Sequence, residues 1–289
     1  MNHKSLRDFI ANPGSALAKG PVALILVEDL VEVDTTIRHH MMAGFVSIVV
    51  FAPTELVLPD DLDGVVTRVD HDMTAEGAVQ DVVNSVIKAA PGQWIYYCFN
   101  AEYLFHPFCE TRSISEMLAF HTEERRDAVL GYVIDLYAKD LNRFPDAVSL
   151  DGAHLDKSGY YALARPDPKK PGETKTRQLN FFGGLRWRFE EHIAKDRRRI
   201  DRIPLFRAKT GLRMRSDFTF EDEEYNTYSC EWHHNLTVAV VSFRTAKALK
   251  SNAGSTFDIN TFSWHNSAEF SWDSQQLLDL GLMEPGQWF

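Results

Sequence analysis

The sequence predicts an α/β fold in which a doubly wound mixed sheet is flanked by helices within a single large domain. Short apolar runs alternate with helix-like segments over the first hundred residues. Residues 22–27, 46–51 and 94–99 are apolar almost throughout, which is typical of strands that a parallel sheet buries on both faces. Strands that alternate with helices imply right-handed crossovers, and these place helices on both sides of the sheet.

The helices between these strands have recognisable ends. Asp34 predicts the N-cap of a helix over residues 35–42, and Gly44 predicts its end. After a further strand at residues 64–69, apolar side chains recur at helical spacing over residues 75–90, where a Pro-Gly pair follows. The order of elements is therefore strand, helix, strand, repeated.

The second half of the chain alternates less clearly. Residues 114–127 predict an amphipathic helix, residues 128–137 a strand and residues 236–250 another helix. Residues 165–176 are rich in Pro, Lys and Gly, which predicts an exposed loop.

Polar residues follow several of the predicted strands. They are Glu28-Asp29, Asp70-His71-Asp72 and Asn100-Ala101-Glu102. The carboxyl ends of parallel strands share one edge of the sheet, and open α/β sheets bind ligands there. We therefore expect the chemistry of this protein at that edge.

Composition excludes some classes of function. The 289 residues include 41 acidic and 31 basic side chains, and the net charge of −10 disfavours nucleic acid as a partner. Three cysteines without paired spacing predict a reducing, cytoplasmic location. Neither a signal peptide nor a membrane-spanning run is recognisable, so any attachment to the inner face of the membrane is expected to be peripheral.

Several motifs resemble those of family-2-type glycosyltransferases with the GT-A fold. The strand Leu24-Ile25-Leu26-Val27 leads into Glu28-Asp29, and the following helix ends in His39-His40-Met41-Met42-Ala43-Gly44. A tryptophan-led strand then precedes Asn100-Ala101-Glu102, where that family typically carries Asp-x-Asp. The resemblance implies a GT-A-like domain over residues 21–250, an N-terminal extension over 1–20, and a C-terminal extension over 251–289 that packs on the core.

The resemblance also implies a site for a nucleotide-diphosphate sugar. Its donor-binding candidates are Glu28, Asp72, Asn100 and Arg186. Arg186 follows Gly183-Gly184 and offers bidentate hydrogen bonds to phosphate. The alternative for Arg186 is a surface turn with salt-bridged arginines.

A divalent metal, Mn or Mg, would neutralise the charge that grows on the diphosphate leaving group. The candidate metal ligands are Glu102, His233 and His234. Other interpretations stay open. Glu102 merely ends a strand, or it aligns with the Glu of the family's Glu-Phe-Leu, in which case both acidic ligands are missing. The two histidines belong to an N-terminal capping region of a helix, with one ring packed in the core.

An acceptor hydroxyl needs a carboxylate base. Asp135 lies in the apolar run Tyr132-Val133-Ile134-Asp135-Leu136-Tyr137, and a carboxylate there either serves function or pairs with an arginine. Asp151 is the second candidate, although loop carboxylates such as Asp151 and Asp156 are usually only solvated.

The sequence thus predicts an enzyme that transfers a sugar from a nucleotide-diphosphate sugar to a glycan or lipid-linked acceptor in polysaccharide biosynthesis. The alternative is a catalytically silent nucleotide-sugar-binding or scaffold protein with a degenerate metal motif. A metal-dependent hydrolase that uses Glu231, His233 and His234 is a weaker alternative, because the sequence contains no HExxH motif or comparable spacing of ligands. The apolar tail at residues 277–289 is expected to pack on its own core or on a second subunit of a homodimer.

Overall fold

The computed structural model of the protein describes residues 1–229 and 235–288. Two compact units make up this chain. Unit 1 contains Met1–Leu104, Thr111–Val129 and Ile203–Asn226, and unit 2 contains Phe105–Glu110, Leu130–Arg202 and Thr227–Phe289. His233 and His234, two of the predicted metal ligands, lie outside the described residues.

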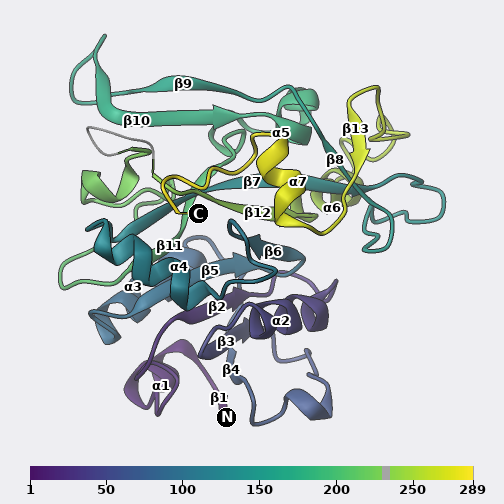
Figure 1. Ribbon diagram of the computed structural model, residues 1–289. Coiled ribbons are helices and arrows are strands. Elements are labelled where there is room, and N and C mark those ends of the chain that lie inside the picture. The colour runs from purple at the N-terminus through teal and green to yellow at the C-terminus, as the bar shows by residue number, and fades with distance from the viewer. Residues whose placement is uncertain (230–234, 289) are drawn as a thin grey trace. The chain divides into compact units, whose positions relative to one another are not determined.

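Unit 1 is built on parallel strands in the order β1-β4-β3-β2-β5, with β11 antiparallel beside β5 (Figure 1). The central strands β2, β3 and β5 are buried almost throughout, as their apolar sequences require. The strands are β1 (Asn2–His3), β2 (Val22–Leu26), β3 (Ser47–Ala52), β4 (Thr67–Asp70), β5 (Trp94–Phe99) and β11 (Asp201–Arg207), and β6 (Glu102–Phe105) follows β5.

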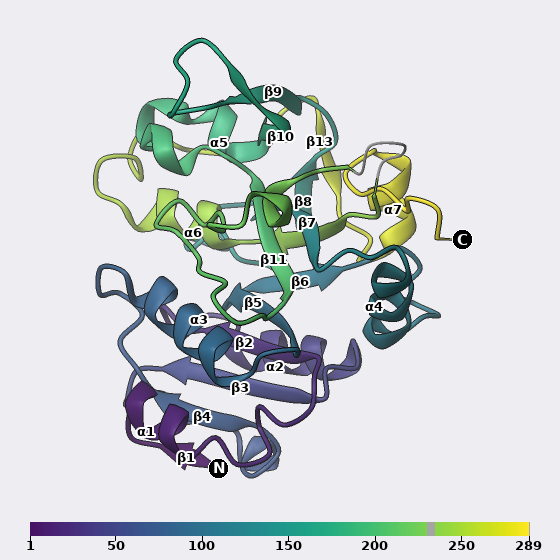
Figure 2. The same cartoon turned by 90° about the vertical axis from the view of Figure 1, so that its left-hand side faces the viewer.

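Helices cover both faces of these strands. The helices α1 and α3 lie on one face and contact each other, whereas α2 packs on β2 and β3 from the other face (Figures 1 and 2). A stripe of apolar residues, Val82, Val83, Val86 and Ile87, forms the buried face of α3. The helices of this unit are α1 (Leu6–Ala11), α2 (Val33–Met42), α3 (Ala78–Ala89) and α4 (Ile114–Glu123).

Strand order creates a topological switch point in unit 1. From β2 the chain moves outward to β3 and then β4 on one side, and it returns to place β5 on the other side of β2. The loop after β2 and the short turn after β5 therefore lie at this switch point, and open α/β sheets bind ligands at such a point.

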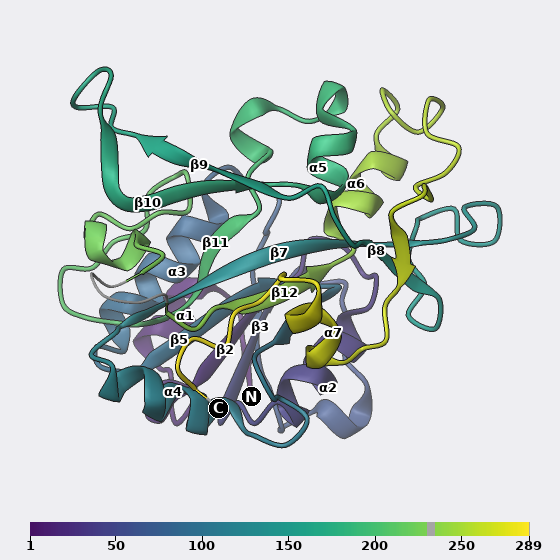
Figure 3. The ribbon, with the colours of Figure 1, turned by 45° about the horizontal axis from the view of Figure 1, so that its top comes forward.

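Unit 2 centres on β7, which pairs with β12 in parallel and with β8 in antiparallel orientation. The hairpin of β9 and β10 forms a separate two-stranded sheet (Figure 3). The strands are β7 (Ala128–Ala138), β8 (Ala153–Asp156), β9 (Tyr161–Pro166), β10 (Thr174–Phe182), β12 (Val238–Ser242) and β13 (Ser267–Glu269), and the helices are α5 (Gly184–Arg188), α6 (Arg244–Ser251) and α7 (Ser274–Asp279).

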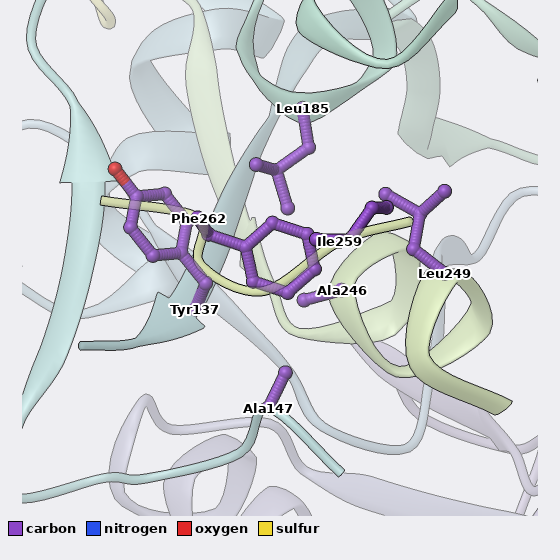
Figure 4. Packing of buried hydrophobic residues seen from close by; sticks show 7 residues of the cluster. All are labelled: Tyr137, Ala147, Leu185, Ala246, Leu249, Ile259 and Phe262. Carbon is purple, nitrogen blue, oxygen red and sulfur yellow. The ribbon is translucent and has the colours of Figure 1, made fainter. Parts of the chain in front are cut away.

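A small apolar core holds β7, α5 and α6 together. Side chains from these elements, from the segment between β7 and β8 and from the segment before β13 contribute to it, as Figure 4 shows. Its members are Tyr137, Ala147, Leu185, Ala246, Leu249, Ile259 and Phe262. Tyr137 lies two residues after Asp135 and Leu185 directly precedes Arg186, so the core anchors the backbone next to both side chains.

The structure confirms an α/β fold with a mixed sheet flanked by helices, and the predicted strand at residues 94–99 is β5. The predicted helix over residues 236–250 is wrong in its first half. Residues Val238–Ser242 form β12, because this β-branched run is buried beside β7, and α6 begins only at Arg244. The predicted loop at residues 165–176 is shorter, since β9 and β10 include its two ends.

Among the described residues, no helix combines the length and the apolar character needed to cross a membrane.

Candidate functional site

Asn100 ties the end of β5 to the loop that follows β2 at the switch point. Its Oδ1 accepts a hydrogen bond from the Glu28 backbone N–H at 3.0 Å, and its Nδ2 donates to Asp29 Oδ1 at 2.7 Å and to the Val31 carbonyl at 2.9 Å. We call these four residues the Asn100 network. An aspartate could accept the first bond but could not donate the other two, so the amide suits this position.

The turn after Asn100 is also held by side chains. Ala101 adopts a left-handed backbone with φ +59°, and its N–H donates to Thr36 Oγ1 at 2.8 Å. The Glu102 carboxylate accepts the Phe99 N–H at 2.9 Å and is 1% exposed. Glu102 therefore bonds back to the turn that carries it.

Asp72 and Glu28, two further donor-binding candidates, lie at the same sheet edge. Glu28 is half-buried two residues after the end of β2, and Asp72 is exposed two residues after the end of β4. Asp72 Oδ1 accepts hydrogen bonds from the Thr74 hydroxyl at 2.6 Å and from its N–H at 2.9 Å, and these bonds lower the pKa of Asp72. The structure thus connects Glu28 with Asn100, whereas Asp72 is engaged with its own turn.

The described residues do not offer a fitting metal site. They contain no group of three His, Cys, Asp or Glu side chains placed to hold a metal ion. Asn100 Oδ1 and Glu102 already accept backbone hydrogen bonds. The predicted metal ligation stays a prediction, because His233 and His234 lie outside the described residues.

In unit 2, the structure brings Asp135 and Arg186 together. Asp135 Oδ1 lies 3.5 Å from Arg186 Nε, and the Arg186 backbone N–H donates to Oδ2 at 3.3 Å. The alternative interpretation of Asp135, pairing with an arginine, is confirmed. Gly184 allows this approach, since its φ is +62° and a Cβ there would lie 3.0 Å from Asp135 Oδ2.

Burial dominates the electrostatics of Asp135. Its side chain is 0% exposed, and this desolvation raises the pKa of Asp135, while Arg186 and the Thr245 hydroxyl act in the opposite direction. The raised pKa has the direction that a general base needs. An acceptor hydroxyl could reach this carboxylate only if neighbouring groups moved.

Asp156, for which the sequence predicts a solvated loop position, lies in β8 and is 1% exposed. Its Oδ1 accepts hydrogen bonds from Tyr137 Oη at 2.6 Å, Trp264 Nε1 at 2.7 Å and Arg188 Nη1 at 2.9 Å. The Arg188 guanidinium lies over the Trp264 ring, 4.6 Å from its centroid. We call these four residues the Asp156 cluster. No local motif marks it, because the donors come from distant segments.

Tyr160 packs beside the two buried carboxylates. Its ring covers Gly183, and its buried hydroxyl has no hydrogen-bond partner among the described residues. Burial, followed by the charges of Asp156 and Asp135, raises the pKa of Tyr160 well above its usual value. The phenol therefore stays protonated at neutral pH.

Asp151, the second candidate base, lies in the segment between β7 and β8. Its side chain is exposed, and it makes no hydrogen bond or ion pair with any other residue that the structure describes. Asp135 and Asp151 thus occupy opposite environments, one buried and paired and the other solvated.

Comparison with known proteins does not assign this chain to a family. No protein-family model matches the sequence, and no curated protein is significantly similar to it.

Proposed function

We propose that this protein is a glycosyltransferase that takes a sugar from a nucleotide-diphosphate sugar and transfers it to a glycan or lipid-linked acceptor. The observation that carries the proposal is the Asn100 network at the switch point of a parallel sheet. The position is the one at which doubly wound sheets bind nucleotides, and the polar contacts hold the β2 loop against the turn after β5 before any ligand arrives.

The charges at this edge suggest how a donor would lie. Glu28 and Asp29 are carboxylates, which accept hydrogen bonds from ribose hydroxyls and base N–H groups but repel a diphosphate. We therefore assign the nucleoside, rather than the diphosphate, to the loop after β2. Arg186, which lies in unit 2, stays a phosphate-binding candidate through the resemblance alone.

The remaining chemistry needs a base and a means of stabilising the leaving group. Asp135 and Asp151 stay the proposed bases, of which Asp151 is accessible and Asp135 has the raised pKa. We assign no catalytic step to Mn or Mg, because the described donor set does not fit a metal. The proposal places the enzyme in the cytoplasm, with peripheral attachment to the membrane when the acceptor is lipid-linked.

A catalytically silent nucleotide-sugar-binding protein is the second candidate. It is favoured by one observation, the engagement of Glu102 with its own turn at the position of the family's metal motif. Such a protein would keep the switch-point crevice and bind donors without transferring their sugars.

A thermal-shift panel tests donor binding. UDP, GDP, CMP and their sugars are each added with and without Mn²⁺, because a ligand at 100 times its Kd stabilises the native state by about 2.7 kcal/mol. We expect one nucleotide series to raise Tm. If none of them does, both candidate functions are wrong. If one of them does, an assay of hydrolysis or sugar transfer with that donor separates the two candidates, because only an enzyme releases or transfers the sugar.

A matched pair of variants locates the site. Glu28→Gln is expected to reduce the nucleotide-induced shift while leaving the ligand-free Tm within about 1 °C of wild type, because a half-buried surface carboxylate contributes little to stability. Glu123→Gln, the same change at an exposed position at the end of α4, is the control. If the nucleotide-induced Tm shift is equal in the two variants, the nucleoside does not bind at the switch point.

A further inference from the structure

A pocket within unit 2 has a composition unlike the rest of this acidic chain. Its volume is about 270 Å³, and it lies between the β9–β10 hairpin and the segment from α5 to residue 198. Its lining residues are Tyr161, Phe182, Arg186, Trp187, Glu190, Lys195 and Arg198. Three cationic side chains face one carboxylate there, although the whole protein carries a net charge of −10.

Aromatic rings line one part of this pocket. Tyr161 and Phe182 are opposite each other in the hairpin and stack with centroids 5.3 Å apart and planes inclined by 22°. Trp187 on α5 is 41% exposed, and Tyr161 is 44% exposed. Exposed ring faces fixed on regular elements are suited to packing against the C–H face of a ring-shaped ligand.

The three cations of the pocket differ in their engagement. Arg198 donates to the Glu190 carboxylate at 2.8 Å and to the Glu190 carbonyl at 2.7 Å, so its charge is balanced. Arg186 lies against buried Asp135 and donates to the Arg199 carbonyl at 2.7 Å. Lys195 is exposed, and its ammonium has no ion-pair or hydrogen-bond partner within the described part of the chain. Lys195 therefore supplies an uncompensated positive charge beside the aromatic faces.

We infer that this pocket binds a single acidic sugar ring, with Trp187 and Tyr161 against the ring, Lys195 on its anionic group and Glu190 accepting hydrogen bonds from its hydroxyls. The volume lies just below the 300–1,000 Å³ of drug-sized ligand sites, which suits one ring better than the base, ribose and phosphate of a nucleotide. If the proposed glycosyl transfer is correct, this sugar belongs to the acceptor; that role, unlike the binding, rests on the proposed function.

Isothermal titration of the full chain tests the ligand class. Glucuronate and glucose 6-phosphate supply the anion as carboxylate and as phosphate, with glucose, inorganic phosphate and UMP as comparisons. We expect at least one of the acidic sugars to bind at least tenfold more tightly than glucose and than phosphate, because ring and charge are both recognised. Equal binding of glucose, equal binding of phosphate alone, or tighter binding of UMP would each overturn the inference.

Variants test the named contacts. Lys195→Ala is expected to weaken binding of the preferred acidic sugar by at least about fivefold, since a charged hydrogen bond is lost. Trp187→Ala should weaken acidic sugar and glucose alike. Lys169→Ala, an exposed lysine of the hairpin loop outside the pocket, is the control and should leave binding unchanged. Unchanged binding in Lys195→Ala would overturn the assignment.

The two proposals fail separately. If nucleotides raise Tm but no acidic sugar binds, the pocket inference is wrong and the proposed function stands. If an acidic sugar binds while no nucleotide raises Tm, the pocket inference stands and the proposed transfer is wrong.

Discussion

The Asn100 network in unit 1 and the Asp156 cluster in unit 2 bury polar groups in different ways. Asn100 is neutral, and one amide group satisfies three backbone or side-chain partners. Asp156 is a carboxylate that collects a phenol, an indole and a guanidinium from β7, α5 and the segment before β13.

The difference concerns charge and desolvation. A satisfied neutral amide costs little to bury, whereas a buried ion needs a partner and several hydrogen bonds to offset its lost hydration. Next to Asp156, Asp135 pairs with Arg186 at 3.5 Å, and its pKa is raised. Asp135 in unit 2 is therefore a group whose protonation changes on folding, whereas the Asn100 side chain is a neutral amide that holds two loops in place.

The largest expected effect concerns Gly183, which lets Tyr160 pack beside the buried carboxylates. At φ +155°, a Cβ on residue 183 would lie 2.2 Å from Tyr160 Cδ1, so Gly183→Ala combines backbone strain with a clash. We expect a loss of about 3 kcal/mol or more in the free energy of unfolding, measured by urea denaturation.

Gly172→Ala is the control for that change. Residue 172 has φ +87° with nothing within 4 Å of a Cβ, so only the left-handed backbone penalty of about 1 kcal/mol applies. Losses of equal size in the two variants would contradict the close packing of Tyr160 on Gly183.

A smaller effect is expected from Asn100→Ala, which removes the acceptor for Glu28 N–H and the donors to Asp29 and Val31. Because the Glu28 end of the network is half-buried, water replaces part of the lost bonding, and we expect a loss of about 2 kcal/mol. Urea denaturation measures it, with exposed Asn12→Ala as the matched change. A loss below about 0.5 kcal/mol would show that the network does not hold the loops.

The smallest expected effect is the pH dependence that Asp135 gives to the free energy of unfolding. Its folded pKa is raised above the unfolded value of about 3.9, so folding favours its protonated form. Its contribution to stability is therefore fully present below about pH 3.9 and is lost as pH rises through the folded pKa. Asp135→Asn cannot ionise, so the stability of this variant relative to wild type should increase from about pH 4 upward.

Urea denaturation of both proteins between about pH 4 and 8 measures this difference. Arg186, Thr245 and Asp156 face the Asp135 carboxylate. In Asp135→Asn, Arg186 keeps its charge but has no carboxylate partner, and this lowers the stability of the variant by the same amount at every pH in this range. Asp151→Asn repeats the substitution at an exposed position. A difference that is flat or falls with rising pH would contradict the raised pKa.

The parallel strands of unit 1 were predictable because each apolar run is long enough to be buried on both faces and is separated from the next by a helix. The edge that carries Glu28, Asp72 and Asn100 followed from the same order. Residues 238–242 were not predictable, because a short apolar run has no period that distinguishes a strand from a helix, and only pairing with β7 decides it.

The candidate site shows the same division. The sequence indicated that Asp135 sits in an apolar strand and that Arg186 follows two glycines, but not that they pair, since 51 residues separate them. It showed an asparagine where an acidic motif was expected, and could not show that its amide donates to Asp29 and Val31.

By itself, then, the sequence determined the alternation of strands and helices and the sheet edge on which polar residues gather, because both depend on local periodicity. The tertiary structure alone decided which of those side chains are engaged. Asn100 and Glu102 bond to the backbone, Asp135 to Arg186, and Asp156 to donors up to 108 residues away. Hydrogen bonds and desolvation depend on the distance between groups in space, and the number of residues between two groups does not determine that distance.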